Sequence, residues 1–158
     1  MIIESPVLGS VTVSEERMYT FAGGIPGFEE YRKFVIIQEG DQTPFAYLQC
    51  VDEPNLILLV ANPFVFYPEY DFEISDAVVQ TLAIQDREDV VVWSVVTASD
   101  SLESATINLL APVIVNQRTM QGKQVILTNR EYKTKHPLLA AAGEDRMLGG
   151  DTDARTEP

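Results

Sequence analysis

The sequence has one cysteine and one histidine in 158 residues, and these two scarcities exclude several kinds of site. Cys50 has no partner for an internal disulfide, which fits a reducing compartment, and we expect its side chain to be buried. Zinc normally takes three or four histidine or cysteine ligands, and the chain offers two. A catalytic arrangement built on histidine must use His136, which stands in "KTKHPLL" without a recognisable motif. We therefore expect no enzyme activity, no metal and no cofactor.

Long apolar runs are also missing. No run reaches the ~18 residues that a membrane span needs, so we expect no membrane association. The opening "MIIESPVLGS" lacks the basic flank and long apolar stretch of a signal peptide, and we expect a cytoplasmic protein. The length favours one domain, which we assign to residues 1–141. Residues 142–158 are small, polar, glycine-rich and acidic, which predicts a flexible tail.

Basic residues are few: eleven Lys and Arg face 24 Asp and Glu, a net charge of −13. Residues 34–117 hold thirteen of the acids and one base, Arg87. Such a segment repels nucleic acid and attracts a basic protein, although a merely solubilising acidic surface is an equally ordinary explanation. Residues 118–135 are basic, with five bases and one acid. We interpret them as a solvated hairpin that pairs with nearby acids.

Short segments rich in β-branched or aromatic residues recur between turn residues, as in strands. They are "SVTVS", "MYTFA", "KFVIIQ", "FAYLQCV", "NLILLVAN", "VVVWSVV", "TINLL", "VIVN" and "QVILTN". They predict an all-β, mostly antiparallel fold, either a small β-barrel-like domain or a tight sandwich. One short helix is expected near residues 75–83, where Ser75 stands as a cap before helically spaced apolar residues.

Three further features are expected to be architectural. The glycines of "FAGGIPGFEEY" lack the lysine of a phosphate-binding loop and predict a tight turn. Asn108, in an apolar run, needs hydrogen-bond partners and is expected to brace a neighbouring loop. Pro112 cannot donate to a strand ladder, so the strand is expected to break there.

The stretch "NPFVFYPEYDFEI", residues 62–74, interleaves aromatic and acidic residues. Read as a strand, it has two faces because successive side chains alternate. One face is expected to be core and includes Phe64, Tyr70 and Phe72. The other is expected to be exposed and to bind a partner through Tyr67, Glu69, Asp71 and Glu73. Pro68 places the strand at a sheet edge, where acids also guard against aggregation and where a partner peptide can pair.

A second use of the same acids stays open at this point. Glu69, Asp71 and Glu73 share one face of the expected strand, as the ligands of a carboxylate-based site for magnesium or calcium do. The sequence has no calcium-loop pattern around them. A divalent-metal-binding or hydrolytic domain is therefore the alternative to a binding protein.

Four stretches together resemble the FliW family of flagellar assembly factors. They are "FAGGIPGFEEY", "NPFVFYPEYDFEI", "ATINLLAPVIVN", and "GKQVIL" followed by "YKTKHPL". They occur in the family's order, and the resemblance covers roughly residues 1–139. It implies a small β-barrel-like protein without catalytic activity.

The resemblance also implies two protein partners. FliW-like proteins bind CsrA, a dimeric RNA-binding repressor of translation, and they bind flagellin, which holds the factor until it is exported. The freed factor then relieves repression from a position away from the RNA site, helped by its negative charge. We accordingly expect no direct contact with nucleic acid, a monomer when alone, and two copies per CsrA dimer.

Overall fold

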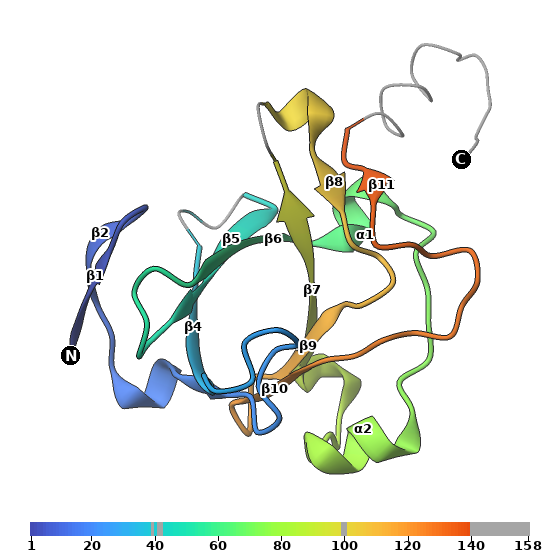
Figure 1. Ribbon diagram of the computed structural model, residues 1–158. Helices are drawn as coiled ribbons and strands as arrows, with labels where there is room; N and C mark the ends of the chain where they lie inside the picture. The colour runs from blue at the N-terminus through green and yellow to red at the C-terminus, as the bar shows by residue number, and fades with distance from the viewer. Residues whose placement is uncertain (39, 41–42, 99–100, 140–158) are drawn as a thin grey trace.

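The computed structural model shows a closed barrel, which Figure 1 views along its axis. The structure describes residues 1–38, 40, 43–98 and 101–139. The expected tail, 142–158, lies outside them. In the part that is described, no helix has the length and apolar character needed to cross a membrane.

Seven strands form the barrel. In spatial order they are β7 (Val90–Thr97), β6 (Ile57–Ala61), β5 (Phe45–Cys50), β4 (Lys33–Ile37), β3 (Tyr19–Thr20), β10 (Gln121–Gln124) and β9 (Val113–Asn116). β9 pairs back onto β7 and closes the ring. All neighbours are antiparallel except β3 and β10, which run parallel and meet at one position, Gln121 opposite Thr20. The predicted all-β, mostly antiparallel barrel is confirmed.

The barrel interior is filled by every second side chain of its strands, as strand geometry requires. On β5 the inward residues are Ala46, Leu48 and Cys50, all almost fully buried. Phe21 and Phe34 meet edge to face across the interior, with ring centroids 5.3 Å apart. The expected burial of Cys50 is confirmed.

The glycine-rich stretch forms tight turns, as predicted, with the Gly24 N–H donating to the Phe21 carbonyl and the Phe28 N–H to the Ile25 carbonyl. Gly24 has φ +71°, a conformation that favours glycine. A Cβ added there lies 2.5 Å from the Cα of Glu29. The loop therefore folds back on itself more closely than any larger residue permits.

A second apolar cluster lies outside the barrel. There β8 (Thr106–Ile107) pairs with the end of β7, and β11 (His136–Pro137) pairs with β8. The chain between β8 and β9 is braced by Asn108, whose Oδ1 accepts the backbone N–H groups of Leu110 and Ala111 at 3.0 and 2.9 Å. The expected brace and the expected break at Pro112 are confirmed.

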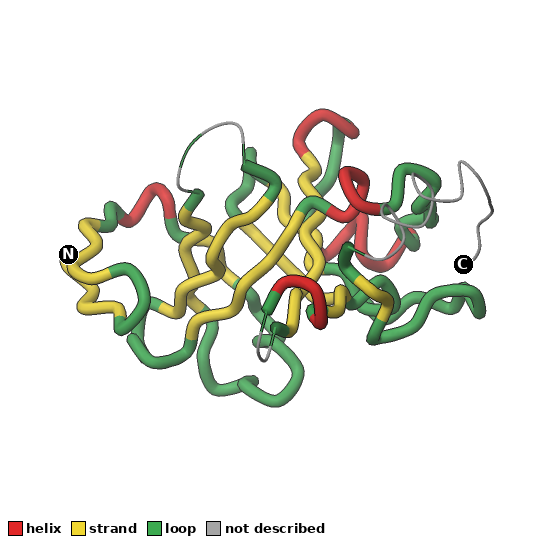
Figure 2. Tube along the Cα trace, turned by 90° about the horizontal axis from the view of Figure 1, so that it is seen from above, coloured by secondary structure: helices red, strands yellow, loops and turns green. Residues whose placement is uncertain are grey.

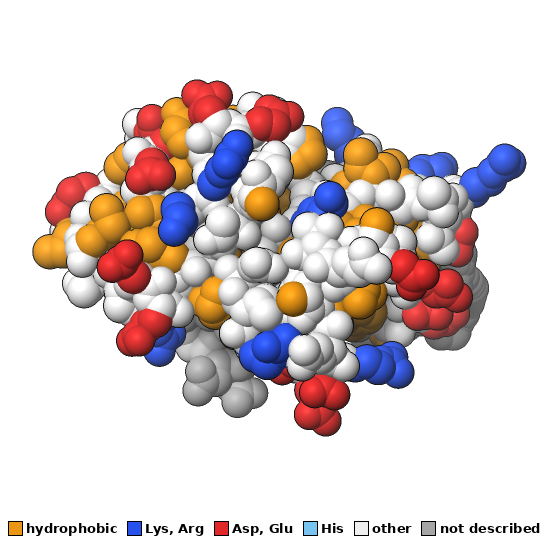
Figure 3. Space-filling model, turned by 90° about the horizontal axis from the view of Figure 1, so that it is seen from below, with side chains coloured by type: hydrophobic (Ala, Val, Ile, Leu, Met, Phe, Trp, Pro, Cys, Tyr) orange, Lys and Arg blue, Asp and Glu red, His pale blue; other side chains and the backbone are white. Residues whose placement is uncertain are grey.

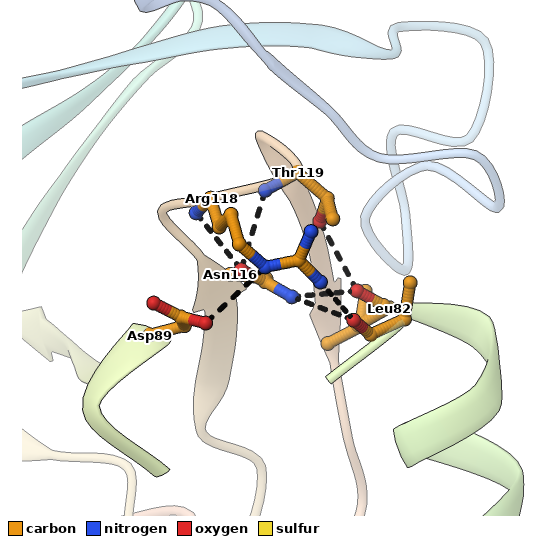
Figure 4. A network of polar contacts seen from close by, with 6 residues as sticks. Leu82, Asp89, Asn116, Arg118 and Thr119 are labelled. Atoms are coloured by element: carbon orange, nitrogen blue, oxygen red, sulfur yellow. Dashed lines mark hydrogen bonds and ion pairs between the residues drawn. The ribbon is translucent and has the colours of Figure 1, made fainter. Parts of the chain in front are cut away.

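The helix α2 (Asp76–Thr81) packs Val78 and Leu82 against Ile114 of β9. Ser75 caps its start by accepting the Val78 N–H, so the predicted helix is confirmed. Its last turn is held by the buried Asn116, whose Nδ2 donates to the carbonyls of Leu82 and Ala83 at 2.8 and 3.2 Å (Figure 4).

The first two strands form a separate hairpin. β1 (Ile2–Ser5) pairs only with β2 (Gly9–Thr12) among the strands described, and Ile3 packs against Val35 and Val51 of the barrel side. In Figures 1 and 2 the hairpin lies at one end of the molecule, with β8 and β11 toward the other. Three 3₁₀ turns complete the described elements: η1 (Glu15–Arg17), η2 (Arg87–Asp89) and η3 (Leu102–Ser104).

Two sequence predictions about β10 and the residues around it are wrong. The strand expected in "QVILTN" starts earlier, since β10 spans Gln121–Gln124 and no strand follows until β11. The basic residues 118–135 form a hairpin only in part, because β9 and β10 are followed by a long loop. The expected pairing with acids does occur at Arg118, whose Nε lies 3.3 Å from Oδ2 of Asp89.

Candidate partner-binding surface

Residues 62–75 connect β6 to α2, and they do not form the predicted strand. They begin with a second helix that the sequence reading missed, α1 (Pro63–Phe66). Asn62 accepts the Phe64 N–H at 3.0 Å, and proline follows it at the first helical position. Both are helix-start signals, and they override the strand propensity of the aromatic residues.

From residue 67 the chain runs without strand pairing along the second apolar cluster. Alternation still sorts its side chains, as predicted. Tyr70 is buried and Phe72 is half-buried, whereas Glu69, Asp71 and Glu73 are exposed. Glu69 lies in a turn that the Tyr70 N–H closes on the Tyr67 carbonyl at 2.9 Å, and beyond it the side chains of residues 70–73 alternate between buried and exposed.

Tyr70 anchors the segment. Its side chain is 4 % exposed, and its hydroxyl donates to the carbonyl of Leu109 at 2.7 Å. Its ring lies 4.7 Å from Tyr132, 5.2 Å from Phe72 and 5.6 Å from Phe64, measured between centroids. Burial raises the pKa of the Tyr70 hydroxyl, so the group stays a donor at neutral pH.

A second tyrosine holds the segment from the long loop. The Tyr132 hydroxyl accepts the Asp71 N–H at 2.9 Å and donates to the Asp71 carbonyl at 3.0 Å. One side chain thus takes the place of a strand neighbour for this residue. The sequence reading missed Tyr132 as part of the surface, and its only signal was an isolated aromatic among basic residues.

Tyr67 is not part of a free outer face, contrary to the prediction. It is half-buried, its hydroxyl donates to the carbonyl of Pro137, and its ring packs edge-on against His136 with centroids 5.6 Å apart. Its contacts tie the segment to β11. We therefore assign Tyr67 a positioning role, and we name Glu69, Asp71 and Glu73 the acidic surface.

The protonation state of His136 is expected to affect the contacts between Tyr67 and β11. Its Nε2 accepts the Lys133 N–H at 2.8 Å, which requires the neutral ring. Burial, and then the charge of Lys133, lower its pKa in the folded state. Because the neutral form is favoured on folding, the stabilisation is present above the unfolded pKa of about 6.5 and is lost as pH falls through the lower folded value.

We therefore expect the melting temperature of the chain to fall more steeply below pH 6.5 than that of a His136→Gln variant. Carboxylates titrate in both proteins, so the difference between the two curves isolates His136. Thermal unfolding at half-unit steps from pH 5 to 8 measures it. Parallel curves would show that His136 does not contribute.

The apolar neighbour of the acidic surface is α1. Phe64 is 42 % exposed and Val65 is 56 % exposed, so the prediction that Phe64 belongs to the core is wrong. The helix turns these side chains outward, while Tyr70 and Phe72 keep their predicted supporting places. An exposed aromatic therefore stands beside three exposed carboxylates, and such a combination suits a protein interface.

The three acids do not converge. No salt bridge to them occurs among the described residues, and within that same part no three His, Cys, Asp or Glu side chains gather closely enough to hold a metal. The arrangement gives no support to the alternative of a carboxylate metal site at these positions.

The sequence is similar to known proteins over nearly its whole described length. The family profile described as "FliW protein" matches residues 2–138. The chain belongs to the FliW family. The flagellar assembly factor FliW of Bacillus pumilus is 41 % identical over 142 residues, covering 90 % of this chain and 99 % of the relative. That of Bacillus subtilis is 40 % identical over 138 residues, covering 87 % and 96 %.

A solved structure supports the same family assignment at the level of the fold. A crystal structure of the flagellar assembly factor FliW superposes with a TM-score of 0.82 at 38 % identity, covering 87 % of this chain and 96 % of that one. The family resemblance drawn from the four sequence stretches is confirmed, as is the barrel that it implied.

Proposed function

We propose that the chain is a non-enzymatic cytoplasmic factor of flagellar assembly that binds CsrA and is alternately held by flagellin. Its relatives carry the name flagellar assembly factor, and family membership covers nearly the whole described fold. Accumulating flagellin occupies the factor. When flagellin is exported, the free factor binds CsrA and relieves the repression of flagellin synthesis.

One observation supports the choice of surface. Tyr70 and Tyr132 fix the backbone that carries Glu69, Asp71 and Glu73, and these three exposed acids have no counterion among the described residues. Carboxylates held on a fixed backbone attract a basic protein over distances of about a Debye length and speed its approach. Phe64 and Val65 beside it offer apolar contact once the partner arrives.

The charge also provides the mechanism for displacing RNA. A chain of net charge −13 held beside an RNA-binding protein repels phosphates, so RNA affinity falls without any contact at the RNA site. The effect weakens as salt rises. A symmetric CsrA dimer presents two equivalent surfaces, so two copies of this chain, each a monomer when free, are expected per dimer.

The test of this function is a calorimetric titration of the chain into CsrA, repeated after saturation with flagellin. We expect binding at about one chain per CsrA subunit, with displacement of a bound RNA. Prior flagellin should abolish the heat of binding. Simultaneous binding of both partners would contradict the alternate capture.

The acidic surface has its own test. Replacing Glu69, Asp71 and Glu73 with serine should weaken CsrA binding about tenfold or more at low salt, because local attraction is lost. The matched control replaces Glu15, Glu16 and Glu30, which are exposed elsewhere. Both variants lose three charges. Equal weakening in the two would show that net charge matters and that this surface does not.

A further inference from the structure

Part of one edge of β10 has no strand partner in the described part of the chain. All four residues of β10 pair with β9, but only Gln121 pairs with β3, because β3 ends at Thr20. After Thr20 the chain leaves the barrel wall and enters the glycine-rich loop. Among the described strands, the rest of β10 therefore has a partner on one side only.

A recess lies at this point. Its volume is about 260 Å³, and its walls come from the loop after β3, from the end of α2 and from β10. The residues that line it include Gly23, Glu29, Leu82, Gln121, Gly122 and Lys123. The recess is smaller than the pockets that hold drug-sized ligands, so its size suits one side chain and a short length of backbone.

One wall residue, Gln121, carries a buried acceptor without a donor among the described residues. Oε1 of Gln121 is buried and receives no hydrogen bond from any residue that the structure describes. A Cβ added at Gly122 meets the Phe21 ring of the barrel interior, so the alternating neighbours Gln121 and Lys123 belong to the outer face of β10. A buried acceptor left unpaired is destabilising, and a bound donor that reaches it removes this cost.

We infer that the recess binds an extended peptide segment of a partner protein. The segment pairs with the free edge of β10 and places a short polar side chain with a donor, such as serine or asparagine, on Gln121. Strand addition of this kind takes affinity from backbone hydrogen bonds and specificity from side-chain pockets. The inference goes beyond the proposed function and uses residues separate from the acidic surface.

The charges at the recess favour a segment without net charge. Glu29 and Lys123 line it from different elements, one acidic and one basic. The Gly27 N–H lowers the pKa of the Glu29 carboxyl, which keeps it ionised. In Figure 3, the face seen from below carries both basic and acidic side chains around an uncharged middle. A basic residue facing Glu29 and an acidic one facing Lys123 complement this pattern.

The probe is a phage-displayed library of random twelve-residue peptides, selected on the full chain. Gly23→Trp fills the recess; Gly23 is exposed, and an added Cβ there meets nothing within 4 Å, so the variant is expected to fold. Thr12→Trp, on the separate hairpin, is the matched control. Fluorescence anisotropy of the enriched peptides measures binding, and hydrogen exchange locates it.

We expect Gly23→Trp to weaken the enriched peptides at least about tenfold, and Thr12→Trp to leave them unchanged. N-methylation of alternate peptide amides should abolish binding, and the amides of Gly122 and Gln124, which face the free edge, should gain protection. The serine variant of the acidic surface should bind the peptides normally, so this site and the proposed function fail separately. Failure to enrich any peptide, equal binding to Gly23→Trp, or association of a second copy of the chain in the recess would overturn the inference.

Discussion

Tyr70→Ala is expected to lower the free energy of unfolding by about 3–5 kcal/mol, because it removes a buried aromatic ring from a packed cluster. The ring contacts Tyr132, Phe72 and Phe64, and its hydroxyl satisfies the Leu109 carbonyl. For a domain of this size the loss corresponds to a fall in melting temperature of about 10 °C. Thermal and urea unfolding measure it.

Two variants separate the contributions at this position. Tyr70→Phe keeps the ring and removes one hydrogen bond, so it should cost about 1–2 kcal/mol. Phe64→Ala removes an exposed ring that contacts Tyr70, and it should lower the free energy of unfolding less than Tyr70→Ala does. If Tyr70→Ala melts like Phe64→Ala, the segment is not anchored by Tyr70.

Asn116→Ala is expected to cost about 2–4 kcal/mol, since it removes several buried hydrogen bonds at once. Nδ2 of Asn116 donates to the carbonyls of Leu82 and Ala83, and its Oδ1 accepts the N–H groups of Arg118 and Thr119 (Figure 4). The Leu82 and Ala83 carbonyls each keep a second donor, the Thr119 hydroxyl and the Arg118 guanidinium, so the larger loss is that of the acceptor for the Arg118 and Thr119 N–H groups. The end of α2 and the turn after β9 should loosen together.

Arg118→Ala is the comparison for this network. Arg118 also donates to the Ala83 carbonyl and pairs with Asp89, but its side chain is 44 % exposed. Its loss should cost less than about 1 kcal/mol, because water replaces exposed partners. Hydrogen exchange should show faster exchange at residues 78–82 in Asn116→Ala alone. Equal stability of the two variants would contradict a clamp centred on Asn116.

The fold was largely predictable because strand patterns are local. The β-branched runs of β6 and β7 and the capped start of α2 stand in the sequence as they stand in the structure. What could not be predicted is which strands pair to close the barrel. Nothing local indicates that β10 lies beside β3, because that contact joins residues about a hundred positions apart in the chain.

The candidate surface was predictable only in part, for a similar reason. Alternation correctly sorted Glu69, Asp71 and Glu73 from Tyr70 and Phe72. It failed at Phe64, where the Asn62 cap starts a helix, and at Tyr67, whose partner Pro137 is distant in sequence. Propensity indicates the conformation that a segment prefers, whereas contacts with residues distant in sequence decide the conformation that it adopts.

The single parallel contact between β3 and β10 also bears on how the chain folds. β4, β5, β6 and β7 form a meander and pair with their sequence neighbours, through short loops up to β6 and through residues 62–89 from β6 to β7. Joining Thr20 to Gln121 closes a loop of about a hundred residues, which carries a larger entropic cost. On the ribosome, the meander is therefore expected to assemble first, and the ring to close only after the last of its strands has emerged.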